Sequence, residues 1–356
     1  MKAIVESKPL KAALAFLNKI APAHRNKPVL GYCLMRAVGN TVTLSATDLE
    51  IYGKVEIQAR VDDPGEVLLP ITKVMKIITM ALSVVSGDKK NVSIGEISLV
   101  TYDPAEMPRL LDAVSMTTLD RLAELVDSVK YATLTHKSNY AINGILLESD
   151  ANTLSAVATD KHRLAYAYTD WTGPEFNHIL PRKFADMLVA IKADRIGLFE
   201  VAGKKGVGAG NGKQTVLAFG VEGQFPKYGH LLKTDGKIIV KADTENLSNA
   251  LAAMVGIGET DNVKLEIKKD KVLVYPLSEA ASTGGMEVSA ESNEEINIGV
   301  NAKFLIGGLR EAGRTARITI TNPLTPVVIE RTDTGGWDFL SPAIQWKYIL
   351  MPVELA

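Results

Sequence analysis

The sequence predicts an α+β protein built from three similar domains, each combining two helices with antiparallel sheets. Two observations lead to this fold class. Segments with a helical spacing of apolar residues are followed by segments in which apolar and polar residues alternate, as they do in a strand. A short phrase at residues 40–48 also returns in similar form at 152–160. The offset between the two copies of this phrase fits a whole domain of about 100–150 residues and is too long for a solenoid repeat.

Six segments show the spacing of an amphipathic helix. In the first, Leu10, Leu14 and Leu17 fall on one face. Several begin with a capping residue or an early proline, as at Pro181 and Asp243. The predicted helices span residues 8–20, 72–82, 117–130, 182–195, 243–255 and 301–314.

Between these helices the apolar period falls to two and β-branched residues dominate, as at 41–44, 264–267 and 317–320. The order helix, strands, helix, strands therefore occurs three times, which favours antiparallel sheets in each copy. The third copy lacks a clear Ala-Thr-Asp phrase, so its membership rests on this pattern alone. The predicted domains are residues 1–116, 117–235 and 236–356.

Composition restricts the class of protein. The 356 residues are 46% hydrophobic and 23% charged, which is ordinary for a globular chain. A formal net charge of −1 argues against a uniformly basic nucleic-acid-binding protein. The six predicted helices together are nevertheless positive, so the remainder is negative. For any one helix this is an ordinary solvated face. If all six faced one side, that side would attract phosphate without reading bases, although the third and fifth helices are acidic.

The compartment is predicted from three features. Cys33 is the single cysteine and lies in an apolar stretch, so we expect a buried thiol and no disulfide within the chain. The acid Glu6 stands where a secretion signal would be apolar. No apolar run approaches the roughly 18 residues of a membrane span. We therefore expect a cytoplasmic protein with no membrane partner.

The glycine-rich stretch 203–214 does not fit a phosphate-binding loop. A P-loop would need glycine at Val207 and serine or threonine at Gln214. The dinucleotide-binding spacing fails at Asn211, and a strand pattern follows at 215–219. We predict a flexible hairpin loop here.

No catalytic or metal-binding constellation is found. No two of the five histidines have the spacing of a helical metal pair, and there is no nucleophile elbow. Asp48 and Asp160 could form a carboxylate pair, but their equivalent places in the repeat favour a turn-capping role for each. We predict no enzymatic activity, no catalytic residues, no metal and no cofactor.

Four segments, in the same order, resemble the bacterial sliding clamp family, the beta subunit of DNA polymerase III. The resemblance covers essentially the whole chain. The segments are residues 40–50; 143–148 followed by Val157-Ala158-Thr159-Asp160-Lys161-His162-Arg163-Leu164-Ala165; Phe225-Pro226-Lys227-Tyr228; and Tyr348-Ile349-Leu350-Met351-Pro352-Val353-Glu354-Leu355.

This resemblance implies the DNA clamp fold, in which two inner helices of each domain line the hole of a head-to-tail homodimeric ring. Such a ring encircles duplex DNA and slides without sequence preference. It tethers the replicative polymerase and has no catalysis of its own. The implied partners are double-stranded DNA, the DNA polymerase III catalytic subunit, the clamp loader and other proteins with a clamp-binding motif.

The resemblance also implies three sets of site residues. Partner peptides would dock in an apolar groove between the second and third domains, formed by Ile142, Thr159, Lys161, His162, Arg163, Leu164, Pro226, His230, Leu231, Leu324, Pro326, Ile349, Met351, Pro352 and Val353. DNA would face Arg25, Lys27, Lys73, Lys76, Lys137, Tyr140, Arg182 and Lys183. The ring would close through Ile97 and Leu99 against Met254 and Val255.

The chain departs from the family pattern beside the groove. Lys161 stands where the family commonly has glycine, and Gly229-His230 replaces a more basic pair. Glu354 occupies a position where a basic residue is frequent, and Ala356 extends the usual end. The preferred peptide, and whether this is a principal or an accessory clamp, stay open. So do two other functions: a peptide-docking scaffold that seldom loads on DNA, and a nucleotide-using enzyme built on 203–213.

Overall fold

The computed structural model describes residues 1–22, 26–79, 81–111, 115–134, 141–150, 152–233, 235–277, 284–331 and 344–355. The chain forms two compact units, which are treated separately below. The first unit combines Met1–Ala123 with Asp186–Gly220, and the second combines Glu124–Ala185 with Val221–Ala356. Within the described ranges, no helix is both long and apolar enough to cross a bilayer.

One order of elements occurs three times along the described chain. Apart from short 3-10 turns, it is one strand, a helix, four strands, a second helix and three strands. We call these stretches the first repeat (β1 to β8), the second repeat (β9 to β16) and the third repeat (β17 to β24). The mixed helix and antiparallel-sheet class predicted from sequence is confirmed. The exact domain bounds stay a prediction, because the two compact units divide the second repeat between them.

The helices are α1 (Ser7–Ile20), α2 (Ile71–Ile77), α3 (Leu122–Lys130), α4 (Arg182–Ala190), α5 (Thr244–Ile257) and α6 (Ala302–Leu309). The strands of the first repeat are β1 (Lys2–Glu6), β2 (Tyr32–Val38), β3 (Thr41–Thr47), β4 (Ile51–Asp63), β5 (Gly65–Pro70), β6 (Leu82–Gly87), β7 (Asn91–Ile94) and β8 (Ile97–Val100). Those of the second are β9 (Thr117–Thr118), β10 (Gly144–Ser149), β11 (Thr153–Thr159), β12 (Arg163–Asp170), β13 (Asn177–Pro181), β14 (Arg195–Val201), β15 (Lys204–Gly210) and β16 (Gln214–Phe219). Those of the third are β17 (Ile238–Asp243), β18 (Asn262–Ile267), β19 (Lys271–Pro276), β20 (Met286–Ser292), β21 (Ile296–Asn301), β22 (Thr315–Ile320), β23 (Val327–Arg331) and β24 (Gln345–Leu350).

Each unit contains one antiparallel sheet that crosses a repeat boundary. In the first unit the strand order is β8-β7-β6-β1-β4-β16-β15-β14-β9, with β3, β2 and β5 continuing from β4. In the second it is β13-β10-β11-β12-β24-β23-β22-β17-β20-β19-β18-β21. The last strand of the second repeat thus pairs with the fourth strand of the first, β16 on β4. The last strand of the third pairs in the same way with the fourth of the second, β24 on β12.

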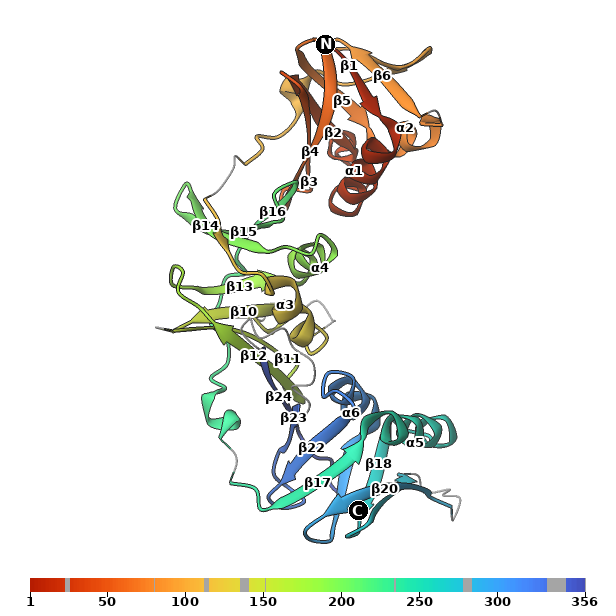
Figure 1. Ribbon diagram of the computed structural model, residues 1–356, viewed down its shortest axis with the longest axis vertical. Coiled ribbons are helices and arrows are strands. Elements are labelled where there is room, and N and C mark those ends of the chain that lie inside the picture. Colours follow the sequence, from red (N-terminus) through yellow and green to blue (C-terminus); the bar gives the residue numbers. More distant parts are fainter. Residues whose placement is uncertain are drawn as a thin grey trace. The chain divides into compact units, whose positions relative to one another are not determined.

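The helices cover one face of these sheets. In the first repeat, α1 packs beside α2 and against β3 and β4, with Leu10, Leu14 and Leu17 fully buried. In the third repeat, α5 and α6 lie side by side (Figure 1). There α5 packs against β17 to β20, and α6 packs against β21 and β24. This burial of one apolar stripe per helix is the main stabilising contribution expected of an amphipathic helix.

Four predicted helices are shorter than expected. Those predicted at 182–195 and 301–314 end early, at Ala190 and Leu309, before strands β14 and β22. Tertiary pairing explains the other two. The second ends at Ile77, because Leu82 begins β6 and pairs with Glu6 of β1. The third begins at Leu122, because Thr117 and Thr118 form β9 against β14. Backbone pairing overrides a helical spacing of apolar residues when a sheet edge is available.

The hairpin loop predicted at the glycine-rich stretch is wrong: Lys204–Gly210 is strand β15. A Cβ atom on Gly206 would lie 2.2 Å from the ring of Phe199 on the neighbouring strand. Glycine is therefore used here for close approach inside a sheet, and the actual turn lies at Ala202 and Gly203, which have positive φ. The predicted strand after it is confirmed as β16.

Two helical glycines give a stability prediction with a built-in control. A Cβ on Gly308 of α6 would lie 2.5 Å from the ring of Tyr348, whereas a Cβ on Gly256 of α5 meets nothing within 4 Å. We expect Gly308→Ala to lower the free energy of unfolding by about 1–3 kcal/mol through overpacking. Gly256→Ala should raise it by about 0.5–1 kcal/mol. Thermal unfolding followed by circular dichroism measures both, and equal shifts for the two variants would contradict this packing.

Candidate functional site

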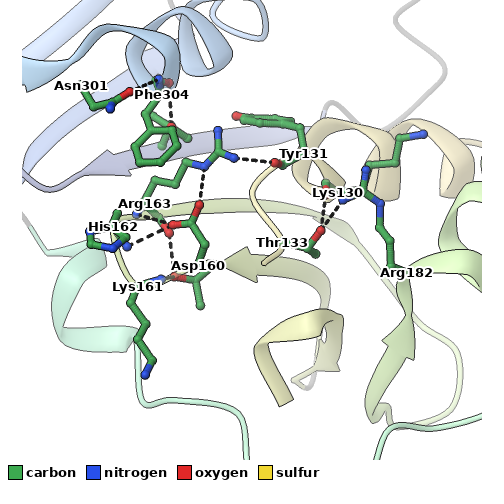
Figure 2. A network of polar contacts seen from close by, with 12 residues as sticks. Lys130, Tyr131, Thr133, Asp160, Lys161, His162, Arg163, Arg182, Asn301 and Phe304 are labelled. Carbon is green, nitrogen blue, oxygen red and sulfur yellow. Dashed lines mark hydrogen bonds and ion pairs between the residues drawn. The ribbon is translucent and has the colours of Figure 1, made fainter. Parts of the chain in front are cut away.

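A hydrogen-bonded turn joins β11 to β12 at the centre of the candidate site (Figure 2). Oδ1 of Asp160 accepts hydrogen bonds from the backbone N–H groups of His162 and Arg163, each at 3.1 Å. The Thr159 hydroxyl donates to the Arg163 carbonyl at 2.6 Å and accepts from the Lys161 N–H at 3.1 Å. These side chains satisfy the backbone groups that the turn takes out of the sheet ladder.

The equivalent turn between β3 and β4 has the same four bonds. Oδ1 of Asp48 accepts from the N–H groups of Glu50, at 3.0 Å, and Ile51, at 2.7 Å. The Thr47 hydroxyl donates to the Ile51 carbonyl and accepts from the Leu49 N–H, both at 2.8 Å. The prediction that each repeated aspartate caps a turn is confirmed. The repeated phrase therefore encodes one turn used twice.

Both turns place the residue after the aspartate in a left-handed backbone conformation. φ is 78° at Lys161 and 81° at Leu49. Only glycine adopts this region without a steric penalty from Cβ. Lys161, which replaces the glycine expected from the family resemblance, therefore keeps a strained backbone beside the predicted groove.

The second carboxylate oxygen of Asp160 holds the guanidinium group of Arg163. Nε of Arg163 donates to Oδ2 of Asp160 at 2.9 Å, and Nη2 donates to the Tyr131 carbonyl at 2.9 Å. Cζ of Arg163 lies 4.4 Å from the centre of the Phe304 ring in α6 (Figure 2). We call these four residues the Arg163 cage. The ion pair is nearly buried, with side-chain exposure of 14% for Arg163 and 9% for Asp160, so charge-assisted bonds and a cation–π contact link the turn to α6.

Aromatic residues of β24 support the cage. The ring of Tyr348 stacks on Tyr131 with 5.9 Å between centroids, and on Trp346 with 6.0 Å. The Tyr348 hydroxyl donates to the Phe304 carbonyl at 2.8 Å, and the indole N–H of Trp346 donates to the Ser128 carbonyl at 3.1 Å. Burial raises the pKa of Tyr348, which keeps its hydroxyl protonated as a donor.

The segment after β24 is tied to the same turn. The Met351 N–H donates to the His162 carbonyl at 2.9 Å, and the Val353 N–H donates to the Gly299 carbonyl at 2.8 Å. The His162 ring stacks against Phe304 with 6.3 Å between centroids. The side chain of Met351 nevertheless stays 39% exposed. An apolar side chain held by fixed backbone but open to solvent is suited to meet a partner.

An apolar cluster lies on the opposite face of this sheet. Successive strand residues point to opposite faces, so Leu164 faces away from the Arg163 cage. We call it the groove cluster. Its members are Ala141, Leu146, Val157, Leu164, Ile179, Phe225, Val328 and Ile349, with Tyr166, Val221, Tyr228, Leu231 and Leu232 packed against them.

The segment that follows β16 covers part of the groove cluster. Its Tyr228 hydroxyl donates to Oε2 of Glu148 in β10 at 2.8 Å. The Tyr228 ring lies 6.0 Å from Tyr166 and 6.3 Å from Phe225, measured between centroids. Burial, followed by the hydrogen bond to Glu148, raises the pKa of Tyr228, so it remains a neutral donor. The hydrogen bond to Glu148 and the ring contacts of Tyr228 together hold this covering segment in place.

The structure brings three predicted groove residues, Leu164, Leu231 and Ile349, into the groove cluster. Thr159, Lys161 and His162 form the adjoining turn, and Met351, Pro352 and Val353 follow beside it. Pro226 and His230 are exposed on the covering segment, while Leu324 is 71% exposed in the turn that Pro326 closes before β23.

Two predicted groove residues lie elsewhere. Ile142 is buried in a 3-10 turn, Ala141–Asn143, before β10. Arg163 occupies its cage on the other face. The cage partners Tyr131 and Phe304 were not predicted, because an aromatic residue in or after a helix is typical of an ordinary core.

Of the predicted DNA-facing residues, Arg25, Lys137 and Tyr140 lie outside the described residues. In the first unit, Lys73 and Lys76 are both exposed on α2. They share the solvent face of that helix, while its other face carries the buried core residues.

The remaining predicted DNA-facing residues are Lys27, Arg182 and Lys183. Lys27 is exposed just before a 3-10 turn in the first unit. Arg182 begins α4, where its Nη1 donates to the Thr133 hydroxyl, and Lys183 beside it is half-buried.

The predicted ring-closing residues differ in exposure. Ile97 on β8 is 47% exposed, and Leu99 is half-buried. On α5, Met254 is buried and Val255 is half-buried. Among the residues that the structure describes, no group of three or more His, Cys, Asp or Glu side chains is arranged to hold a metal ion.

The chain is similar to known replication proteins over its whole length. Family models match at residues 1–107, described as the N-terminal domain of the DNA polymerase III beta subunit, and at 117–227, described as its central domain. Together they span more than half of the chain. Beta sliding clamps from Caulobacter vibrioides and Pseudomonas putida are each 25% identical, over 100% and 99% of both chains respectively.

Solved structures show the same likeness. A sliding clamp from Pseudomonas aeruginosa bound to griselimycin has a TM-score of 0.88 at 23% identity. A DNA polymerase sliding clamp from Caulobacter crescentus has a TM-score of 0.83 at 23% identity. Each match covers 100% of both chains, so the likeness in fold extends over the whole chain.

The strained turn gives one prediction. Lys161→Gly should raise the free energy of unfolding by about 1 kcal/mol, because glycine removes the penalty at φ 78°. Lys161→Ala, which keeps Cβ, serves as the matched control and should show no such gain. Chemical denaturation measures both variants, and a gain of the same size for alanine would show that the lysine charge is responsible.

The Arg163 cage gives another. Arg163→Ala should lower the free energy of unfolding by about 2–4 kcal/mol, because it leaves the Asp160 carboxylate buried and uncompensated. Arg60→Ala removes an exposed arginine paired with Asp62 and should change stability by less than about 0.5 kcal/mol. Adding Asp160→Asn to Arg163→Ala should restore part of the loss. If the stability losses of the two single substitutions simply added in the double variant, this would argue against an interaction between Arg163 and Asp160.

Proposed function

The chain belongs to the DNA polymerase III beta subunit family, and we propose that it is a sliding clamp, a homodimeric ring that encircles duplex DNA. Sliding clamps are processivity factors: the ring slides without reading sequence and keeps the replicative polymerase at its template. Tethering raises the effective concentration of the polymerase without a chemical step.

The observation that carries this proposal is the repeated strand pairing between repeats. The last strand of the second repeat adds to β4, and the last strand of the third repeat adds to β12, both antiparallel. The last strand of the first repeat, β8, ends its sheet in the described structure. Applied once more, the same rule pairs β8 with the fourth strand of the third repeat, β20, of a second chain.

β20 has the matching edge. Its residues Met286 to Ser289 pair with β19, whereas only Ala290 to Ser292 pair with β17 on the other side. Among the residues that the structure describes, this edge of the first half of β20 is therefore unpaired over the length of β8. Ile97, Val100 and Met286 are exposed apolar residues on these two strands. A contact of this head-to-tail kind, made twice, closes a ring of two chains.

The predicted DNA contacts support the same function. Lys73 and Lys76 lie on the solvent face of α2, and Lys27, Arg182 and Lys183 lie at or near the starts of helical turns. Lysine and arginine side chains favour contacts with phosphate that depend on salt and not on sequence. Arg25, Lys137 and Tyr140 complete the proposed set.

We propose that partner proteins dock a short apolar peptide over the groove cluster, between the second and third repeats. The cluster supplies apolar surface, and the turn at Thr159 to His162 supplies polar groups at its border. A relative of the same fold was solved with griselimycin, which supports a ligand groove in this family. The DNA polymerase III catalytic subunit and the clamp loader are the first expected occupants.

The remaining parts of the proposal follow from this role. A tether needs no nucleophile, cofactor or metal, so we propose that the protein has no enzymatic activity and works in the cytoplasm, where the chromosome lies. The alternative of a docking scaffold that seldom loads on DNA keeps the groove but not the ring.

The experiment measures mass in solution and retention on DNA with the clamp loader and ATP. The proposal predicts a dimer that stays on nicked circular DNA and slides off linear DNA. Val100→Lys puts a charge on the proposed β8 edge and should give monomers that are not retained. Val38→Lys changes a similarly exposed valine of β2 and should leave both results unchanged. A monomeric wild-type chain, or equal retention on circular and linear DNA, would reject the ring. If the protein stayed on neither circular nor linear DNA but still bound the peptide, the docking-scaffold alternative would be favoured.

A further inference from the structure

The first repeat contains a groove at the place equivalent to the groove cluster. The turns at Asp48 and Asp160 align the two repeats, and the strand registers then equate individual positions. Leu34 pairs with Ser45, which pairs with Lys54. At the equivalent positions Leu146 pairs with Val157, which pairs with Tyr166. Both rows lie on the sheet face opposite the helices.

The segment that follows each repeat covers this row in the same way. Met107-Pro108-Arg109 comes after β8 as Phe225-Pro226-Lys227 comes after β16. Met107 and Phe225 are both buried, at 8% and 9% exposure, and therefore anchor their segments alike. The grooves are thus two versions of one structural unit.

The two versions differ in chemistry. The groove of the first repeat has a volume of about 380 Å³. Its floor is apolar at Leu34 and Met107, but its described lining adds three cations, Arg36, Lys54 and Arg109, and no carboxylate. Lys54 replaces Tyr166, and Arg36 stands where the second repeat has Glu148. A hydroxyl also replaces an apolar side chain, because Ser45 stands where the second repeat has Val157.

The existing partners of these cations are weakly held. Arg36 pairs with Glu66 at 2.6 Å and Lys54 with Glu56 at 2.7 Å, and all four side chains are at least 36% exposed. Exposed pairs of this kind contribute little free energy. An incoming carboxylate that is partly removed from water in the groove can therefore compete for both cations, and exposed Arg109 adds a third.

We propose that this groove of the first repeat is a second peptide-docking site, and that its occupant is an acidic segment of a partner protein with an apolar anchor residue. The apolar floor takes the anchor, the three cations take aspartate or glutamate, and Thr43 and Ser45 offer hydroxyls to the peptide backbone. The site goes beyond the tether proposed above and needs neither the ring nor DNA.

The test uses the full chain and two labelled peptides. Both end in leucine and phenylalanine, preceded by aspartates in the acidic peptide and by asparagines in the neutral one. Fluorescence anisotropy should find two sites per chain for the acidic peptide and one for the neutral peptide. Arg109→Glu should weaken the extra site about tenfold, and Lys54→Gln about fivefold. Both should leave neutral-peptide binding unchanged, which also verifies folding. Raising salt should weaken the extra site selectively.

Two further variants assign the sites. Met351→Glu should abolish neutral-peptide binding and keep the extra acidic site, and Arg60→Glu, far from the groove lining, should change neither. A photo-crosslinking acidic peptide should label residues 104–111. A single site for both peptides, or wild-type affinity in both Arg109→Glu and Lys54→Gln, would overturn the proposal. Loss of the ring in the DNA assay would leave this result unaffected, so the two proposals fail separately.

Discussion

Antiparallel pairing between the last strand of one repeat and the fourth strand of the preceding repeat is the interaction on which the molecule depends. Without it, β16 and β24 would expose unpaired backbone edges. The pairing also fixes position, because a shift of one residue would exchange the two faces of the strand. The groove cluster and the Arg163 cage lie on opposite faces of one such joint, β12 on β24. Their geometry therefore follows from one register.

The sequence predicts the parts of this fold that depend on local pattern. Apolar spacing located all six helices, and the repeated aspartates located two turns with the same four hydrogen bonds. Sequence reasoning failed where distant backbone decided the outcome. Leu82 joined β6 because β1 offered an edge, and the glycines of β15 serve close packing against Phe199. Local sequence does not carry that information.

The site was only partly predictable for the same reason. Leu164 and Ile349 were expected in the groove from a family resemblance, and they meet in the groove cluster. The cage partners Tyr131 and Phe304 come from segments far apart in the sequence and carry no distinguishing motif. Alternation along β12 also sends Arg163 to the face opposite Leu164. A residue-by-residue resemblance predicts which positions form a site. The face to which each side chain points depends on its place in the strand.

The two repeats show how one turn supports different surroundings. The position after the turn is Ile51 in the first repeat and Arg163 in the second, while the backbone bonds are unchanged. Since Arg163 is shielded from solvent, dissolved ions screen it far less than they screen exposed lysines. A salt concentration that weakens phosphate contacts of exposed lysines should therefore leave the contact between β12 and β24 intact. The protein should therefore stay folded at such a salt concentration.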